Sequence, residues 1–530
     1  MKTGDFQSPS RGRILLYMLA GLLLLSPLPA GSVYSWSVCL IQLVILTLLF
    51  FNVCRGELAA VDLSSHPLFR WVLWGFGAFL IFGFLQFLPL PRFVVHLLSP
   101  NASGVQNLFQ PDIKAGSLQT LSLFSSRTFQ SFLLFIGYAA IVVLVIYIVR
   151  TLRRVRWIFS LLTGIGAILS VYGIVELFHP NPSILFYKKI YYLDSVTGSF
   201  VNRNHFSAYI CMILPLTLAL LWNHLSHPDW SGFTLRERLK AVGKNGFRKT
   251  VLLFCASFVM IAAVLLSRSR SGGFLLLLMV VLLFGTHVIY TRPFKTISSH
   301  HMSRAFFVLL ILIILFVGIE NSINRFSMEE TLREGQTLVW RSSLRILGQF
   351  PLFGTGLGTF SSVYPLYEDQ WKPGFYSHTN NDYLEFLSEL GFLGFFLLIF
   401  PVVLLLLISF MIWRTRRNPE IKILGLGVMV GSFVMLANSV TDSSLHIPAN
   451  LVLFSTLIGL SFVCVGLKTE TNPDGNKQPV PVGGQNLRSK LDERIKKIAS
   501  QKEDKEWKIR VFMKKPDVDS DTDSEDLFGS

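Results

Sequence analysis

The sequence predicts an all-α polytopic membrane protein with about twelve transmembrane helices. Two observations predict this class. Of the 530 residues, 51% are hydrophobic and only 15% are charged, and the mean hydropathy is +0.52. Apolar runs of roughly 20 residues, the length that spans a bilayer, also recur along the chain. They lie at about 13–30, 32–53, 69–90, 128–149, 157–178, 206–223, 249–267, 272–290, 305–319, 386–412, 421–440 and 449–467.

The first apolar run has two interpretations. Arg11 and Arg13 precede it, and residues 26–30 are small and interrupted by proline, as at a signal-peptide cleavage site. The next apolar run follows almost at once. We therefore favour a hairpin of two retained helices over a cleaved signal peptide.

Composition argues against a disulfide framework, a zinc site and a nucleic-acid partner. No two cysteines form a CxxC pair or lie beside histidines at metal-ligand spacing. The formal net charge is +16, but the basic residues cluster in short connectors and in the tail, where they would orient the helices in a membrane. The five cysteines are Cys39, Cys54, Cys211, Cys255 and Cys464.

A cytoplasmic N-terminus, residues 1–12, satisfies the positive-inside rule for every basic connector. The connectors placed inside are 150–156, 236–249, 292–304 and 414–417. The external loops are then at about 91–127, 179–205, 268–271, 320–385 and 441–448. The largest of them, 320–385, lies between the ninth and tenth predicted helices, and we expect it to be periplasmic.

Three regions follow from this organisation. After the short N-terminal region, residues 13–467 form the transmembrane domain. Beyond it the composition turns polar and charged, which predicts a cytoplasmic and largely disordered tail at 468–530. No internal repeat is visible.

The first external motif, residues 197–206, reads TGSFVNRNHF and leads directly into an apolar helix. Asn202 and Asn204 can cap that helix, and Arg203 lies near its start, where a helix N-terminus attracts anions. The alternative is an ordinary cap with an arginine that reaches to the membrane surface.

The second motif, residues 266–273, reads LSRSRSGG and separates two apolar runs. Arg268 and Arg270 oppose the orientation signal on the external side, so their presence favours a function, with Ser269 between them. The glycines that follow allow another backbone or a ligand to approach closely. Arginine suits a diphosphate because its planar guanidinium donates two parallel hydrogen bonds and stays charged.

The third motif is the long loop, whose length of about 65 residues is typical of a functional segment. Residues 338–350 read as an amphipathic helix, with two arginines, Arg341 and Arg345, one turn apart. Its apolar residues are Leu338, Leu344, Ile346 and Leu347. The glycine-rich run that follows, at 354–358, has no preceding strand and no GK[ST], so we interpret it as a tight turn.

His378 lies near the end of this loop, just before the next apolar run. Histidine titrates close to neutral pH and could take a proton from a sugar hydroxyl. A polar loop residue without chemistry is the alternative. The other external histidines, His96, His179, His205 and His446, show no comparable setting in the sequence.

These motifs together resemble the O-antigen ligase and polymerase superfamily of bacterial inner-membrane glycosyltransferases. The resemblance covers roughly residues 195–400. It is carried by residues 197–206, by Ser269-Arg270-Ser271-Gly272, by Trp340-Arg341 and the glycine-rich turn, and by Asn381-Asp382-Tyr383-Leu384 with Glu389, Gly391 and Gly394.

The resemblance implies a multi-helix fold with a large periplasmic loop and an inverting, metal-independent transfer without a cofactor. The glycan would move from undecaprenyl diphosphate to a hydroxyl acceptor, at the periplasmic face of the inner membrane. The diphosphate-binding arginines of the family map onto Arg270 and, more loosely, onto Arg203 and Arg341. We add Arg268 as a donor-binding candidate. Further residues expected to support the site are Asn202, Asn204, Ser269, Asn380 and Glu389.

The sequence departs from the family pattern at the histidine. The family signature is His followed by Asn, Ser or Gln, then nine residues and Gly-x-x-Gly. Counting back from Gly391 places Asn381 in the second position and Asn380 where the histidine belongs. His378 is two residues upstream, and we assign it the role of base, with Asn381 beside it. The other possibilities are a reaction without a base and an inactive protein.

Several functions remain open within and beyond this class. The acceptor distinguishes a ligase from an O-antigen or exopolysaccharide polymerase and from a protein O-oligosaccharyltransferase. A transporter of anionic or lipid-linked solutes could use the same arginines. Transporters usually carry ionisable residues within their spans and inverted repeats, whereas Glu176 and Glu320 lie only near span ends.

Overall fold

The computed structural model describes residues 11–54, 67–109, 118–185, 187–225, 243–290, 329–368 and 377–467. The chain divides into two compact units, Met1–Lys468 and Thr469–Ser530. All described residues belong to the first unit. The predicted tail and the predicted span at 305–319 lie outside the described residues.

Apolar helices make up nearly all of the described structure, as predicted. Nine of them are long and apolar enough to cross a membrane. They are α2 (Ser35–Cys54), α3 (Pro67–Phe87), α6 (Ser125–Ile148), α7 (Leu152–Leu177), α8 (Arg203–Leu225), α10 (Gly243–Leu266), α15 (Asp382–Thr415), α16 (Pro419–Asn438) and α17 (Pro448–Gly466). Two further helices, α1 (Arg11–Leu25) and α11 (Arg270–Tyr290), contain shorter apolar stretches. Each of these helices lies at a predicted span.

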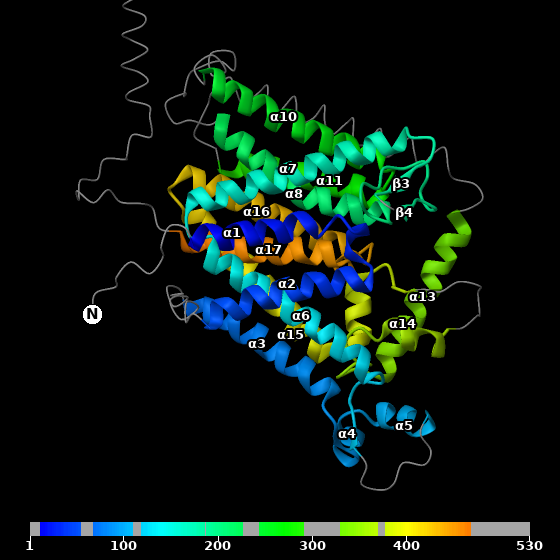
Figure 1. The fold of residues 1–530 in the computed structure, drawn as a ribbon. Coiled ribbons are helices and arrows are strands. Elements are labelled where there is room, and N and C mark those ends of the chain that lie inside the picture. Colours follow the sequence, from blue (N-terminus) through cyan, green and yellow to red (C-terminus); the bar gives the residue numbers. More distant parts are fainter. Residues whose placement is uncertain are drawn as a thin grey trace, which may run out of the picture. The chain divides into compact units, whose positions relative to one another are not determined.

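The helices lie side by side in one bundle (Figure 1). Within the apolar windows, 78% of α8 and 83% of α17 is buried, against 28% of α2 and of α3. Helices α8 and α17 therefore form the centre of the bundle. Helix α16 packs on both of them, α10 covers α7 and α8, and α3 packs against α6 and α15.

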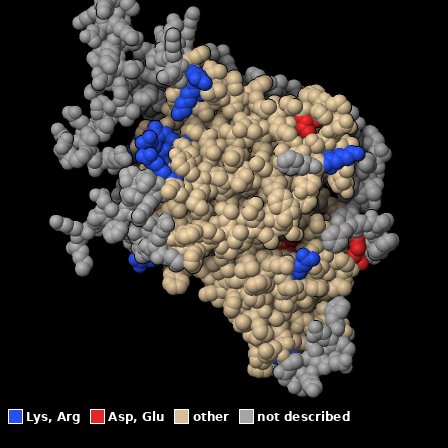
Figure 2. Space-filling model, in the orientation of Figure 1, with Lys and Arg blue, Asp and Glu red and all other residues tan. Residues whose placement is uncertain are grey.

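The described parts of the basic connectors, 150–156, 243–249 and 414–417, lie at one end of the helices, which we call the basic end. There the guanidinium Nε of Arg156, at the start of α7, lies 3.3 Å from Oε1 of Glu420 at the start of α16. Asn223, near the end of α8, donates a hydrogen bond to the same carboxylate oxygen at 3.0 Å. Figure 2 shows Lys and Arg side chains gathered at this end, on the left of the view. The opposite end, which we call the site end, carries the starts of α8, α11 and α15.

Short elements cover part of the site end. Strand β1 (Leu90–Pro91) pairs antiparallel with β2 (Leu118–Gln119), and β3 (Ser183–Ile184) pairs with β4 (Tyr187–Lys188). These two-residue strands were not predicted. Helices α4 (Arg92–Leu98) and α5 (Pro100–Phe109) lie between β1 and β2.

Helix α13 (Glu329–Gln349) corresponds to the predicted amphipathic helix but begins earlier in the chain. Ile346 and Leu347 are buried as expected, whereas Leu344 is exposed, which corrects the predicted apolar face. The helix packs against α5 and the short helix α14 (Phe360–Val363) in a second, smaller core. Its buried residues are Ala102, Val339, Ile346, Phe350, Phe360, Val363 and Tyr364.

The glycine-rich run is a tight turn, as predicted. Gly354, Gly356 and Gly358 all have positive φ, at 67°, 113° and 73°. A Cβ atom on Gly356 would clash with Oγ of Ser122. Only glycine fits that position, because both the backbone conformation and the close neighbour exclude a side chain.

Candidate functional site

His378 lies at the site end, directly before α15. The side chain of Asn381 accepts a hydrogen bond from the backbone N–H of Leu384 at 3.1 Å, so it caps the helix. The backbone carbonyl of Thr379 accepts a hydrogen bond from Nε1 of Trp340 at 3.0 Å, which ties this segment to α13. The segment that carries His378 is therefore fixed to α15 through Asn381 and to α13 through Thr379.

Glu385, one turn into α15, contacts His378 directly. Its Oε1 lies 2.8 Å from Nδ1 of His378, and its side chain is 2% exposed while that of His378 is 34% exposed. The other carboxylate oxygen, Oε2, accepts a hydrogen bond from the backbone N–H of Thr379 at 2.9 Å. A carboxylate in this position fixes the imidazole in one orientation and favours the proton on Nδ1.

His446 belongs to the same cluster, although no motif in the sequence indicates it. It ends the short 3-10 helix η6 (Ser444–His446) between α16 and α17. Its Nδ1 lies 2.6 Å from Oδ1 of Asp382, and its Nε2 lies 3.3 Å from Oε1 of Glu385. The rings of His378 and His446 have centroids 5.1 Å apart. Burial acts against the protonated form, but the Glu385 and Asp382 carboxylates raise the pKa of His446 to about 10.

The loop that holds His446 also reaches the start of α8. Oδ2 of Asp442 lies 3.5 Å from Nε2 of His205, a second histidine that the sequence does not single out. Oδ1 of Asp442 accepts a long hydrogen bond from Asn204 at 3.5 Å, and Oδ1 of Asn204 in turn accepts a hydrogen bond from Oγ of Ser269 at 2.8 Å. Asn204 therefore joins the predicted motif at 197–206 directly to Ser269 in the motif at 266–273, and Asp442 joins Asn204 to the connector that holds His446.

Arg270 is the first residue of α11 and is exposed, directly after Ser269. Arg203 is the first residue of α8; its guanidinium donates a hydrogen bond to Oγ of Ser195 at 3.2 Å and lies 5.1 Å from the ring centroid of Tyr192. Ser269 and Asn204 bring the starts of these two helices together. Asn202 caps α8, since its Oδ1 accepts a hydrogen bond from the backbone N–H of Asn204 at 2.8 Å.

Arg268 forms an exposed ion pair, with its guanidinium 2.7 Å from Oδ2 of Asp194. Arg341 lies exposed on α13, next to Trp340. Asn380 is exposed with φ at 54°, in the left-handed region that asparagine tolerates.

Glu389 supports the site from within α15. Its carboxylate accepts hydrogen bonds from the backbone N–H groups of Gly358 at 2.8 Å and Phe360 at 2.9 Å. Its backbone carbonyl accepts a hydrogen bond from the N–H of Gly356 at 2.9 Å. The side chain is buried, so Glu389 anchors the glycine-rich turn to α15 and does not face the solvent.

His378, Glu385 and His446 also have the composition of a metal site. Each offers one ligand atom, and the three atoms lie within 4.8 Å of one another. Two imidazoles and a carboxylate suit zinc and similar ions. In the described structure Nδ1 of His378 and Nε2 of His446 lie 2.8 and 3.3 Å from the same oxygen of Glu385, which is the arrangement of an ion-pair cluster.

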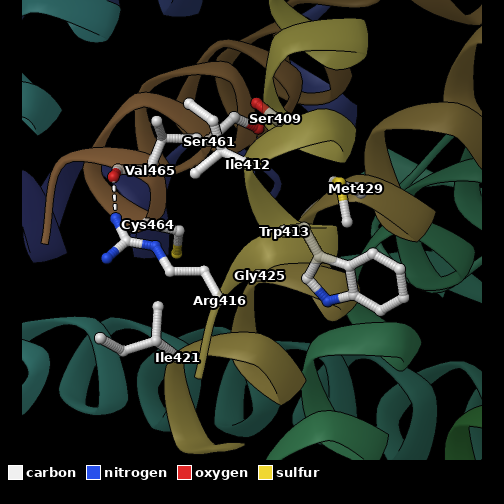
Figure 3. Close-up of a pocket in the computed structure, with 10 residues that line it drawn as sticks. All are labelled: Ser409, Ile412, Trp413, Arg416, Ile421, Gly425, Met429, Ser461, Cys464 and Val465. Atoms are coloured by element: carbon white, nitrogen blue, oxygen red, sulfur yellow. Dashed lines mark hydrogen bonds between the residues drawn. The ribbon is translucent and has the colours of Figure 1, made fainter. Parts of the chain in front are cut away.

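The cavity in Figure 3 is at the basic end and is separate from this cluster. Arg416 and Cys464 line it, and the guanidinium of Arg416 donates a hydrogen bond to the carbonyl of Val465. Its volume is about 20 Å³, which holds a water molecule and is too small for a sugar.

Comparison with known protein families identifies the segment that carries most of this site. Residues 255–399 match the family model described as O-antigen ligase. The chain carries an O-antigen ligase domain. A domain of this kind, in a chain of many apolar helices, indicates a membrane glycosyltransferase. Comparison with curated proteins gave no match.

The O-antigen ligase domain runs from α10 into α15 and includes Arg270, Arg341 and His378. Arg203 and His446 lie outside the matched segment. The contacts of Asn204 with Ser269 and of His446 with Glu385 join the flanking helices to it.

Proposed function

We propose that the protein transfers a glycan from undecaprenyl diphosphate to a hydroxyl acceptor, as an O-antigen ligase. The contact between His378 and Glu385 is the observation that carries this proposal, because it makes His378 an oriented base in place of the family histidine that Asn380 replaces. The polar contacts from Asp442 to Ser269 support a common site with the arginines.

The proposed reaction is a single displacement that inverts the anomeric carbon. Nε2 of His378 accepts the proton of the acceptor hydroxyl as its oxygen bonds to that carbon. The bond from the carbon to the diphosphate oxygen breaks, and its electron pair leaves with undecaprenyl diphosphate. Arg270, with Arg203 and Arg341, compensates the charge that develops on the diphosphate. The arginines take the place that a metal ion has in other glycosyltransferases, so this step uses no metal.

The test uses the full-length protein in detergent with a radiolabelled lipid-linked glycan and candidate acceptors. Arg270→Ala should abolish transfer because the leaving diphosphate keeps an uncompensated charge. Arg127→Ala is the matched control, since Arg127 is an exposed arginine at the start of α6 at the site end and has no part in the proposal. Full activity in Arg270→Ala would refute the proposed role. Chelation of divalent ions should leave the wild-type rate unchanged.

The same assay separates the other candidate functions. A ligase would transfer the glycan to lipid A core, and a polymerase would transfer it to a second lipid-linked repeat. A protein O-oligosaccharyltransferase would transfer it to a peptide that contains Ser or Thr. A transporter would leave the sugar–diphosphate bond intact. Buried Glu176, one of the two acidic residues noted near span ends, forms an ion pair with buried Lys189 at 3.1 Å, which gives it a structural partner.

We also propose that the site end lies in the periplasm, on the outer side of a bacterial inner membrane. The gathering of Lys and Arg side chains of the described residues at the opposite end supports this orientation. Asn380 is an exposed loop position at the site end, so a membrane-impermeant thiol reagent should label Asn380→Cys in intact spheroplasts above the level of the unsubstituted protein. Labelling of Asn380→Cys only after lysis would reverse the orientation.

A further inference from the structure

His446 sits between two carboxylates that have little access to water. Its side chain is 14% exposed, and those of Asp382 and Glu385 are 0% and 2% exposed. The ring of Phe386 stacks on the imidazole with centroids 4.6 Å apart, which fixes the plane of the ring. Buried carboxylates need a cation or hydrogen-bond donors close by, and His446 lies within reach of both.

Each carboxylate is anchored by the backbone on its far side. Oε2 of Glu385 accepts a hydrogen bond from the N–H of Thr379 at 2.9 Å, and Oδ2 of Asp382 accepts one from the N–H of Leu445 at 3.0 Å. The remaining oxygens, Oε1 and Oδ1, therefore point at the imidazoles. Oε1 of Glu385 is shared, at 2.8 Å from His378 and 3.3 Å from His446.

We propose that His446 is a positioning residue, whose imidazolium holds Glu385 as a carboxylate aimed at Nδ1 of His378 and so leaves Nε2 of His378 as the basic nitrogen. This role rests on the proposed function, because it acts through His378. The proton on His446 stays where it is during the reaction, held between Asp382 and Glu385. The raised pKa of His446 agrees with a permanent charge at neutral pH.

The other ionisable groups around η6 leave this assignment intact. Helix α8 contributes His205, which faces Asp442 at 3.5 Å. Helix α15 contributes Glu389 one turn beyond Glu385, and the Glu389 carboxylate is bound to the glycine-rich turn. Helices α16 and α17 also pack on η6, but their described residues at this end include no acid or base.

Two substitutions test the role through the pH dependence of transfer. His446→Gln removes a positive charge near His378, which favours the protonated imidazole and should move the acidic limb of the pH–rate profile to higher pH. Glu385→Gln removes a negative charge and should move the same limb to lower pH. We expect kcat to fall about 10- to 100-fold in each variant, the cost of losing an orienting partner, while KM for the acceptor changes little.

A conservative variant distinguishes charge from packing. His446→Lys keeps a cation between the two carboxylates and should recover part of kcat and return the acidic limb toward its wild-type position. An acidic limb that stays in place in His446→Gln, or that moves in the same direction as in Glu385→Gln, would overturn the proposal.

A measurement without substrate covers the case in which His446→Gln does not fold. Imidazole nitrogen shifts of ¹⁵N-histidine-labelled wild-type protein, with His378→Gln and His179→Gln for assignment, should show one histidine doubly protonated at about pH 8, where ordinary histidines are neutral. If every histidine is neutral there, the proposal is wrong. If the imidazolium is present but the wild-type protein transfers no glycan, the proposed function fails and the charge network stands.

Discussion

Oε1 of Glu385 lies 2.8 Å from Nδ1 of His378, and this contact joins the two parts of the O-antigen ligase domain on which the proposed catalysis depends. His378 comes from a loop and Glu385 from the first turns of α15. The histidine is two residues away from the position that the family pattern assigns. The carboxylate of Glu385 forms a hydrogen bond with Nδ1 of His378, and this contact fixes the orientation of the imidazole. The histidine can therefore act as an oriented base although it is two residues from the family position.

His378→Gln should therefore lower kcat for transfer by about 10²- to 10⁴-fold, the usual contribution of a general base. The protein should remain folded, because the side chain is 34% exposed. His179→Gln is the matched control, since His179 is exposed and bonds to Asn181 within its own loop. Initial rates with a lipid-linked donor measure the effect. An unchanged rate in His378→Gln would remove the base from the mechanism.

The stability of the protein should depend on pH through His446. Its pKa is raised to about 10 in the folded protein, above the ordinary value of 6.5. The stabilisation is therefore complete below about pH 6.5 and is lost as the pH rises through about 10. Removal of one partner from a buried ion pair costs about 3 kcal/mol, so His446→Gln should lower the unfolding midpoint at pH 6 far more than at pH 10. Thermal unfolding in detergent at several pH values measures this difference. An equal difference at all pH values would contradict the assignment.

The glycine-rich turn should not tolerate a side chain at Gly356. Its φ of 113° and the Ser122 hydroxyl, which occupies the space that a Cβ atom would need, both oppose substitution. Gly356→Ala should destabilise the protein by about 1–3 kcal/mol and displace the turn from Glu389. Gly348→Ala is the control, because nothing lies within 4 Å of a Cβ there and α13 continues through it. Thermal unfolding of the two variants side by side measures the contrast, and equal midpoints would show that the turn adapts.

Much of the fold could be predicted because the signal is local. An apolar run of the right length indicates a spanning helix whatever it packs against, and α7 and α17 lie where such runs predicted them. The signal for a helix cap is local as well. Asn202 was predicted to cap the helix that follows it, and its side chain caps α8 in the structure. The face of α13 was harder to predict, because Leu344 is apolar in sequence but is exposed in the structure.

The centre of the site could not be predicted because it is assembled from distant segments. His446 is 64 positions from Asp382 along the chain and lies in a connector that looks like an ordinary link between two apolar runs. The available signal was the polar run of Asp442, Ser443 and Ser444 before it, all of which are buried. A buried polar run at a helix connection indicates contacts with other polar groups, and here these include His205 and Glu385.

Arg268 offers a test of how many arginines hold the donor. Asp194 already neutralises it, and the pair is largely exposed, with 51% and 66% of the side chains accessible. Partial burial acts to raise the pKa of Asp194, but the Ser195 hydroxyl and the Arg268 guanidinium lower it below its ordinary value. The ion pair is thus present at neutral pH and is lost only as the pH falls through that lowered pKa.

Removing Asp194 should leave Arg268 available to a diphosphate. If Arg268 contributes to donor binding, Asp194→Asn should lower KM for the donor, whereas Arg268→Gln alone and the double variant should both raise it. Stability should change by less than about 1 kcal/mol in all three, since exposed ion pairs contribute little. Donor KM and unfolding midpoints of the four proteins in one double-mutant cycle measure both effects. Donor KM values that are the same in all four would restrict diphosphate binding to Arg270, Arg203 and Arg341.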